Sequence, residues 1–310
     1  MKFKNSLKIE KISNVLLLKN FVAIYPQKAL KHTLFDNLTT KHRLSILKYS
    51  FFSTIKNILK FKTSNEKNLF LIFNLWSTGY HHFITETLLK LIIFKKELQN
   101  VTLLTPANSP NFVNDAFKLL DIKSVAVHEG LTLYKELNII ENPNSGLFNP
   151  SHLKILQNEF KQFQNLSAKK NIFLTRRKSR SRKILNEQEI YNFLDENSFS
   201  VIETDDMSFL EQVKLFSNAK ILISSHGAGL TNMVFMPQNS IIIELMPEYS
   251  KYDKFEINKC FENMSNALSF KYIKIDCKRF DYKTQFDTCD ILIDSQELKN
   301  KINSIMENNE

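Results

Sequence analysis

Short apolar runs alternate with segments of helical period along the second half of this sequence, and no other feature constrains the fold as strongly. The predicted strands are residues 171–174, 200–203, 220–223, 241–245 and 272–275. The helices predicted between them are residues 187–196, 208–216 and 255–268. A strand–helix–strand series of this kind predicts a parallel sheet, and such sheets bind ligands at the carboxyl ends of their strands.

The first half follows the same pattern less regularly. Its predicted strands are residues 15–18, 22–25, 69–73 and 101–104. Its predicted helices are residues 80–95, 111–120 and 151–166. A chain of 310 residues suits one large or two ordinary domains. We therefore predict an α/β protein with two domains, residues 1–167 and 168–310.

Composition adds two constraints, one from glycine and one from charge. Only 5 glycines occur, far below average usage, so a retained glycine marks a place where the backbone needs one. The net charge of +10 suits an anionic ligand, an anionic membrane surface or nucleic acid equally well. Apolar residues make up 43% of the chain, which is enough for a hydrophobic core.

The cysteines and the early lysines bear on the compartment. Cys260, Cys277 and Cys289 are odd in number and lack the spacing of a zinc site, which predicts a reducing compartment. Lysines interrupt every early apolar run, so no signal peptide is expected. No apolar stretch approaches the length of a membrane-spanning helix. Together these features predict a cytoplasmic protein.

Two of the five glycines fall in one loop, residues 225–232, which reads Ser-His-Gly-Ala-Gly-Leu-Thr-Asn. The loop follows a buried strand and leads into an apolar helical turn. Such a unit presents backbone N–H groups and the positive end of a helix dipole, which favour a phosphate group. The predicted phosphate-binding residues are His226, Gly227, Ala228, Gly229, Thr231 and Asn232. A tight turn without a ligand is the alternative, because short glycine motifs are weak indicators.

A basic segment, residues 174–183, leaves the end of a predicted strand at the same edge of the sheet. Arginine can bind two phosphate oxygens at once, so we predict Arg176 and Arg182 as counter-charges to a diphosphate. The alternative is a solvated run of charges. Glu244 ends the strand after the glycine loop, and by analogy with dinucleotide-binding folds we predict that it binds the ribose of the ligand that carries the diphosphate. The alternative is a glutamate at a strand end in a surface ion pair.

A third segment, residues 73–86, also carries side chains suited to catalysis. It contains the only tryptophan, a glycine and two histidines at the start of a predicted helix. His82 and Glu86 are four residues apart and therefore share one helix face. A carboxylate can orient an imidazole in this way for general-base catalysis. The alternative is a capping histidine beside a surface glutamate. A zinc site is not expected, because the HExxH motif is absent.

These three segments resemble the motifs of glycosyltransferase family 61, and they occur in the order of that family. Residues 225–245 are similar to its glycine-loop signature, residues 173–176 with 182–187 to its basic motif, and residues 80–86 to its aromatic-His-aromatic-x-x-Glu motif. The resemblance spans about residues 70–250. Phe83 stands where the family commonly has Trp, and the first 65 residues resemble nothing known to us.

The resemblance implies a GT-B-like fold, in which two Rossmann-like domains with parallel sheets face a cleft. It implies inverting transfer of a sugar from a nucleotide-sugar donor, bound by residues 168–310, to a glycan acceptor on the side of residues 1–167. His82 or Glu86 would be the catalytic base. No metal or other cofactor is expected, and the chain lacks the Asp-x-Asp motif with which GT-A enzymes hold Mn²⁺.

Three other classes of function compete with this one. A non-catalytic module that binds anions or glycans on the same fold is the main alternative. A hydrolase ranks lower, because no G-x-S-x-G motif occurs. No nucleic-acid-binding motif is present, so nucleic acid is not an expected partner.

A basic amphipathic helix is predicted at residues 41–62. Its apolar positions fall at helical spacing: Leu44, Leu47, Phe51, Ile55 and Ile58. Its basic residues suit the anionic inner face of a membrane, where an enzyme that extends a lipid-linked capsule or lipopolysaccharide precursor would work. The alternative is a helix that packs its apolar face on the N-terminal domain.

Overall fold

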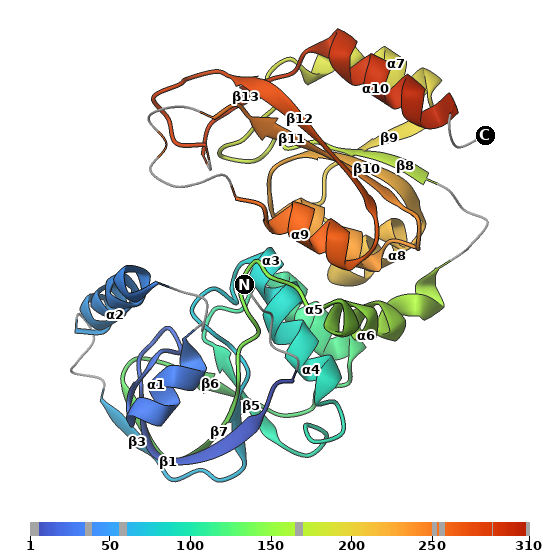
Figure 1. Ribbon diagram of the computed structural model, residues 1–310. Helices are drawn as coiled ribbons and strands as arrows, with labels where there is room; N and C mark the ends of the chain where they lie inside the picture. Colours follow the sequence, from blue (N-terminus) through green and yellow to red (C-terminus); the bar gives the residue numbers. More distant parts are fainter. Residues whose placement is uncertain are drawn as a thin grey trace. The chain divides into compact units, whose positions relative to one another are not determined.

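The computed structural model describes residues 6–34, 39–55, 61–164, 170–249, 253, 258–286 and 288–307. The chain divides into two compact units, Met1–Leu156 and Gln157–Glu310, and each is built around its own β-sheet (Figure 1). The division falls within helix α6 (Pro150–Phe160). The boundary predicted between residues 167 and 168 lies outside the described residues. The protein is α/β, as predicted, and both sheets contain parallel strands.

The first unit contains a seven-stranded sheet. Its strands are β1 (Ile9–Leu17), β2 (Ala23–Tyr25), β3 (Lys62–Ser64), β4 (Leu69–Leu71), β5 (Thr102–Pro106), β6 (Val125–His128) and β7 (Thr132–Ile140). They are ordered β2-β1-β7-β4-β5-β6, and β3 also pairs with β7. The parallel set comprises β7, β3, β4, β5 and β6.

The prediction of parallel sheets is wrong for one side of this sheet, because β1 runs antiparallel to both β2 and β7. A tight turn joins β1 to β2, with the Leu18 N–H donating to the Val22 carbonyl over 2.9 Å. Antiparallel strands can be joined by so short a turn, whereas parallel strands need a crossover. The sheet of the first unit is therefore mixed.

The helical segments of the first unit include one irregular turn. They are α1 (Gln27–Thr33), α2 (Thr40–Ile55), α3 (Tyr80–His82), η2 (Phe83–Leu88), α4 (Leu89–Ile93) and α5 (Asn111–Leu119). The predicted helix 80–95 is thus interrupted by η2, which is π-helical and buried throughout. Single π-helical turns inside α-helices are rare and frequently lie at functional sites.

Helix α2 packs on the first unit by a face that differs from the predicted apolar stripe. Ile46 and Leu47 contact a small core cluster around Leu18. Leu44 and Phe51, which were predicted to share a face with Leu47, are at least half exposed. The rest of the predicted stripe is not described at the level of its side chains, since residues 53–60 lie outside that part of the structure.

The second unit contains a six-stranded sheet in the order β13-β12-β11-β10-β8-β9. The strands are β8 (Lys170–Leu174), β9 (Phe199–Ile202), β10 (Ala219–Ser225), β11 (Ile241–Pro247), β12 (Lys271–Arg279) and β13 (Ile291–Leu292). All pairs are parallel except β12 with β13. This sheet matches the predicted strand series, with a short antiparallel strand added at one edge.

Helices cover both faces of the second sheet. They are α7 (Tyr191–Glu196), α8 (Phe209–Phe216), α9 (Cys260–Ala267) and α10 (Ser295–Glu307), with the 3-10 turns η3 (Lys161–Phe163), η4 (Glu187–Ile190) and η5 (Ala228–Phe235). Figure 1 shows α7 and α10 on one face and α8 and α9 on the other. The largest core cluster of this unit joins strand residues such as Ile223 and Ile243 to Leu194 of α7 and Leu298 of α10.

Two further observations concern the helices. The predicted helix 255–268 begins at Cys260 as far as the structure describes it, since residues 254–257 fall outside the description. Within the described residues, no helix combines the length and the apolar character that a membrane crossing requires.

Candidate functional site

Chemically active side chains gather where β8, β10 and β11 end. Arg176 follows the end of β8, His226 follows the end of β10, and Glu244 lies near the end of β11, opposite Ser224 in the register. Because these strands run parallel, their carboxyl ends meet at one edge of the sheet. The structure thus brings together five of the predicted residues: Arg176, Arg182, His226, Gly227 and Glu244.

Gly227 allows an arginine to approach the backbone. A Cβ built on Gly227 would lie 2.3 Å from Nη1 of Arg176 and 3.1 Å from its Cζ. The φ angle of Gly227 is 167°, an extended conformation open to any residue, so a side chain there would conflict only with the present position of the Arg176 guanidinium. Gly229 makes a similar approach, because a Cβ there would lie 2.5 Å from Cδ2 of Leu174.

Arg176 has the environment of an anion-binding group. Its Nη2 donates to the Ser179 hydroxyl over 2.8 Å, while its Nε is buried without a hydrogen-bond partner among the described residues. No carboxylate of the described ranges forms an ion pair with it. Burial, and then the positive charge of Arg182, lowers the pKa of Arg176 to about 10. An anion at this position would relieve both effects.

Arg182 is tied to the glycine loop by its backbone and its side chain. Its Nη1 donates to the carbonyl of His226 over 3.2 Å, and its own carbonyl accepts from the Ser225 hydroxyl over 3.0 Å. Its φ angle is 60°, a left-handed conformation that is uncommon for a residue with a Cβ. Such conformations persist only where the surroundings fix them, and they cluster at functional sites.

A buried glutamate that was not predicted as a site residue anchors the start of the basic segment. The Thr175 hydroxyl lies 2.7 Å from both carboxylate oxygens of Glu187, and the Tyr191 hydroxyl donates to Oε1 over 2.7 Å. Glu187 is 3% exposed. Thr175 is therefore fixed, and Arg176 follows it directly along the chain.

His226 sits in a buried, partly aromatic environment. Its Nδ1 lies 2.5 Å from Oε1 of Glu244, and the Tyr272 hydroxyl donates to Oε2 of Glu244 over 2.6 Å. The His226 ring packs against Phe261 and Phe286, at centroid distances of 5.2 and 6.2 Å. Tyr272 was not predicted. The ribose-binding role of Glu244 stays a prediction, but both of its oxygens already accept hydrogen bonds within the protein.

The remaining loop residues lie in η5. Thr231 and Asn232 are fully buried, and Asn232 donates to the Gln212 side chain and the Gly229 carbonyl, each over 3.1 Å. Asn232 thus binds η5 to α8. Ala228 and Gly229 are half-buried at the start of η5. Donor binding by Ala228, Gly229, Thr231 and Asn232 stays a prediction.

The first unit contains the second predicted pair. Nδ1 of His82 lies 2.8 Å from Oε1 of Glu86, and the Asn74 amide donates to Oε2 of Glu86 over 2.7 Å. The His82 side chain is 28% exposed, whereas Glu86 is buried. The tryptophan of the same segment, Trp76, lies 5.1 Å from the His82 ring. A buried carboxylate thus holds a partly exposed imidazole, which is the arrangement a general base requires.

This pair belongs to a longer buried network. Asn142 accepts from Lys90 over 2.8 Å and approaches Asn74 at 3.5 Å. Lys90 is fully buried, which is rare for a lysine unless it is paired with a polar group, as Lys90 is with Asn142. His82 is the member of the network that reaches solvent. Across the described ranges, no three His, Cys, Asp or Glu side chains form a group that could hold a metal ion.

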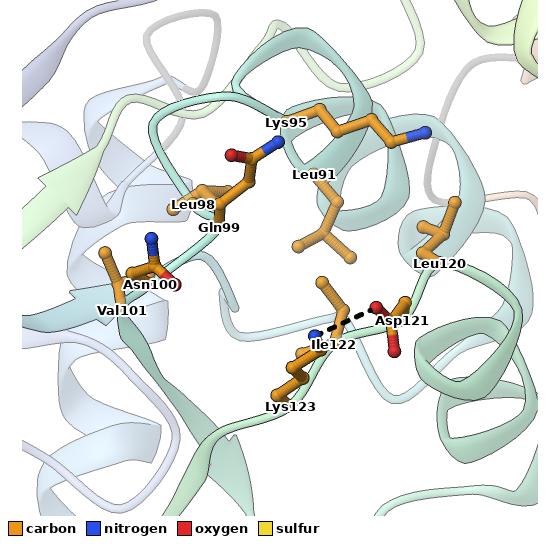
Figure 2. Close-up of a pocket in the computed structure, with 10 residues that line it drawn as sticks. All are labelled: Leu91, Lys95, Leu98, Gln99, Asn100, Val101, Leu120, Asp121, Ile122 and Lys123. Carbon is orange, nitrogen blue, oxygen red and sulfur yellow. Dashed lines mark ion pairs between the residues drawn. The ribbon is translucent and has the colours of Figure 1, made fainter.

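A pocket of about 330 Å³ also lies in the first unit (Figure 2). Its lining includes residues just before β5, such as Val101, and residues before β6, such as Ile122. Asp121 and Lys123 form an ion pair over 3.4 Å at its rim. The pocket therefore lies at the amino ends of these strands, whereas the His82 segment follows the carboxyl end of β4. It is separate from the His82 segment.

Known proteins resemble part of this chain. A family model described as Glycosyltransferase 61 matches residues 80–243, which is more than half of the chain. EGF domain-specific O-linked N-acetylglucosamine transferase of Rattus norvegicus is 29% identical over 136 residues, which cover 42% of this chain and 24% of the rat protein. Its counterpart in Drosophila melanogaster is 30% identical over 132 residues, with the same two shares.

A third relative has a different acceptor in its name. Protein O-linked-mannose beta-1,4-N-acetylglucosaminyltransferase 2 of Xenopus tropicalis is 37% identical over 73 residues, which cover 23% of this chain and 13% of the frog protein. The chain matches about a quarter or less of the length of these relatives.

Proposed function

The chain belongs to glycosyltransferase family 61, and on that premise we propose that it transfers a sugar from a nucleotide-sugar donor to a glycan acceptor. The observation that supports this most directly is the position of Arg176. A guanidinium without a carboxylate partner in the described ranges lies against the backbone of Gly227, at the carboxyl edge of a parallel sheet. This edge is where such sheets bind nucleotides.

The donor diphosphate would bind to the second unit. Arg176 and Arg182 would supply the positive charge that balances the leaving nucleoside diphosphate, and the glycine loop would supply backbone donors. With this charge available from side chains, we propose that the transfer requires no metal ion. Activity that survives a chelating agent would support this part of the proposal, and activity restored only by a divalent cation would contradict it.

The acceptor side would depend on the first unit. The acceptor hydroxyl oxygen forms a bond to the anomeric carbon, the bond from that carbon to the diphosphate breaks, and a base removes the hydroxyl proton. We assign this base to His82, because Glu86 is buried and acts through the imidazole that it orients. Attack opposite the leaving group inverts the anomeric centre.

The sugar and the acceptor are proposed at a coarser level. Two groups of relatives are named as N-acetylglucosaminyltransferases, so N-acetylglucosamine is the first sugar to test. For the acceptor we propose a lipid-linked glycan, such as a capsule or lipopolysaccharide precursor, at the cytoplasmic face of a membrane. The outer face of α2 supports this choice.

The outer face of α2 combines aromatic and basic side chains. Leu44, Tyr49, Phe51 and Phe52 are each at least half exposed. Exposed lysines lie among them, and α2 contains no acidic residue. Aromatic side chains beside lysines suit the surface of an anionic bilayer, so we propose peripheral membrane contact through this face.

A donor screen tests the proposed function. Thermal stabilisation by UDP-, GDP- and CMP-sugars should identify the donor, since a ligand that binds the folded state raises its melting temperature. The stabilising donor should then be hydrolysed slowly, with release of nucleoside diphosphate. Stabilisation without any turnover, even with glycan acceptors, would favour the non-catalytic binding module. No stabilisation by any nucleotide sugar would contradict the proposed transferase.

A further inference from the structure

The side chain of His226 is held by buried hydrogen bonds that a phosphate site does not by itself require. Glu244 is 1% exposed and His226 is 5% exposed. Oε1 of Glu244 contacts Nδ1 of His226, and Oε2 accepts from the Tyr272 hydroxyl. Each carboxylate oxygen therefore has a short contact inside the protein. A glutamate in this environment orients the histidine rather than binding a ligand directly.

The direction of these hydrogen bonds determines which nitrogen of His226 carries a proton. An ionised carboxylate only accepts hydrogen bonds, so Nδ1 must be the donor. Burial, together with the negative charge of Glu244, raises the pKa of Tyr272, so its hydroxyl remains protonated and donates as well. Nε2 of His226 is then the nitrogen that can serve a ligand.

The charged groups around the ring come from every element that packs against it. On one side Arg182 donates to the His226 carbonyl, and Arg176 lies against the next residue. On the side of α9, burial raises the pKa of Cys260 to about 12, so its thiol is neutral. Beside Phe286, the Asp253 carboxylate is paired with the buried guanidinium of Arg279.

We propose that Glu244 and Tyr272 are positioning residues for His226, and that a bound diphosphate draws a second proton onto this ring. With the diphosphate bound, Nε2 takes a proton from water and donates a hydrogen bond to a phosphate oxygen. The imidazolium then adds to the charge that stabilises the leaving group. This inference rests on the proposed donor site.

NMR of protein labelled with ¹⁵N-histidine tests the proposal, and the His226→Gln variant assigns the signal. The ring proton is expected on Nδ1 in the free protein, and on both nitrogens when inorganic pyrophosphate is bound. Glu244→Gln should abolish the preference for Nδ1 and weaken pyrophosphate binding about tenfold. Tyr272→Phe should weaken it by a smaller factor. Glu248→Gln and Tyr282→Phe are matched controls, because this pair makes the same contact at an exposed position over 2.8 Å.

Each outcome separates the proposal from the proposed function. A neutral His226 ring in the pyrophosphate complex would overturn the proton uptake. Unchanged affinity in Tyr272→Phe and in folded Glu244→Gln would overturn the positioning role. If Glu244→Gln weakens binding of UDP, GDP or CDP but not of pyrophosphate, the carboxylate binds ribose instead. Failure of the wild-type protein to bind pyrophosphate or any of these nucleotides would contradict the donor site itself.

Discussion

The guanidinium of Arg176 lies so close to the backbone of Gly227 that a Cβ on residue 227 would come within 2.3 Å of Nη1. The extended backbone of Gly227 is one that any residue could adopt, so a side chain at residue 227 would have to displace only the guanidinium of Arg176. The buried Nε of Arg176 also has no partner among the described residues. An anion that reached this edge of the sheet would meet a cation already held in position.

Replacing Gly227 with Ala should displace Arg176, because the new methyl group and the guanidinium cannot occupy the same space. We expect pyrophosphate binding to weaken by about tenfold or more, the loss of a charge-assisted hydrogen bond. Isothermal titration calorimetry measures this. Gly79→Ala is the control, since a Cβ there meets its nearest atom at 3.4 Å. Equal affinities of Gly227→Ala and wild type would contradict the role of Arg176.

The affinity for pyrophosphate should decrease at alkaline pH, because Arg176 loses its charge there. Its pKa is lowered to about 10, so its charge is complete at neutral pH and is lost as pH rises through this value. Binding should therefore weaken between about pH 9 and 11, more steeply than the titration of ordinary lysines alone produces. Arg176→Ala should bind weakly at neutral pH and lose the additional alkaline decrease. Parallel pH profiles for the two proteins would be inconsistent with this assignment.

Arg182→Ala should weaken donor binding by roughly 1.5–3 kcal/mol, the range for hydrogen bonds to charged groups. Removing this guanidinium also removes its contact with the His226 carbonyl. Arg180→Ala is a suitable control, because Arg180 is an exposed arginine of the same segment. Calorimetric affinity that does not change in Arg182→Ala would remove this residue from the site.

His82→Ala and Glu86→Gln should reduce the rate of sugar transfer by roughly 10²–10⁴, the usual contribution of a general base. Donor affinity should be retained, because neither residue belongs to the unit that contains Arg176. His81→Ala, at the neighbouring position, should have a much smaller effect. Normal turnover by both variants would place the base elsewhere.

Contact with anionic membranes should depend on the outer face of α2. The double variant Phe51→Ser, Phe52→Ser should float less with vesicles that contain phosphatidylglycerol, and the fold should be unaffected because both side chains are largely exposed. Salt should weaken binding of the wild-type protein, since the attraction of lysines is screened. Val125→Ser, Val127→Ser is the control, an exposed apolar pair on β6. No flotation of the wild-type protein at low ionic strength would exclude the contact.

The glycine loop and its strand could be predicted because their signal is local. An apolar run, two glycines and an apolar turn follow one another along the chain, and the structure places β10 and η5 there. The same local signal did not reveal which side chains turn inward. Asn232 donates to Gln212 of α8, a partner that only the packing of η5 on α8 supplies, and its role toward phosphate stays a prediction.

Neither the role of Tyr272 nor strand β7 could be predicted from the sequence, for different reasons. Tyr272 reaches Glu244 because β12 pairs with β11, and no pattern within either strand announces that pairing. β7 lies between β1 and β4 in its sheet, but Lys135 and Glu136 interrupt its apolar pattern. The Glu136 carboxylate forms an ion pair with Lys11 of β1 over 2.8 Å. Both the Tyr272–Glu244 contact and the place of β7 in its sheet depend on contacts between segments that are far apart in the sequence.

The π-helical turn η2 makes the length of its segment as important as its residues. An α-helix advances about 100° per residue, so deleting one residue between His82 and Glu86 would rotate everything on one side of the deletion by about that angle. Glu86 could then no longer meet both His82 and Asn74. A one-residue deletion there should disconnect the imidazole from its buried support even though His82 and Glu86 are both retained. A library of in-frame single-residue deletions should therefore contain no active member at these positions.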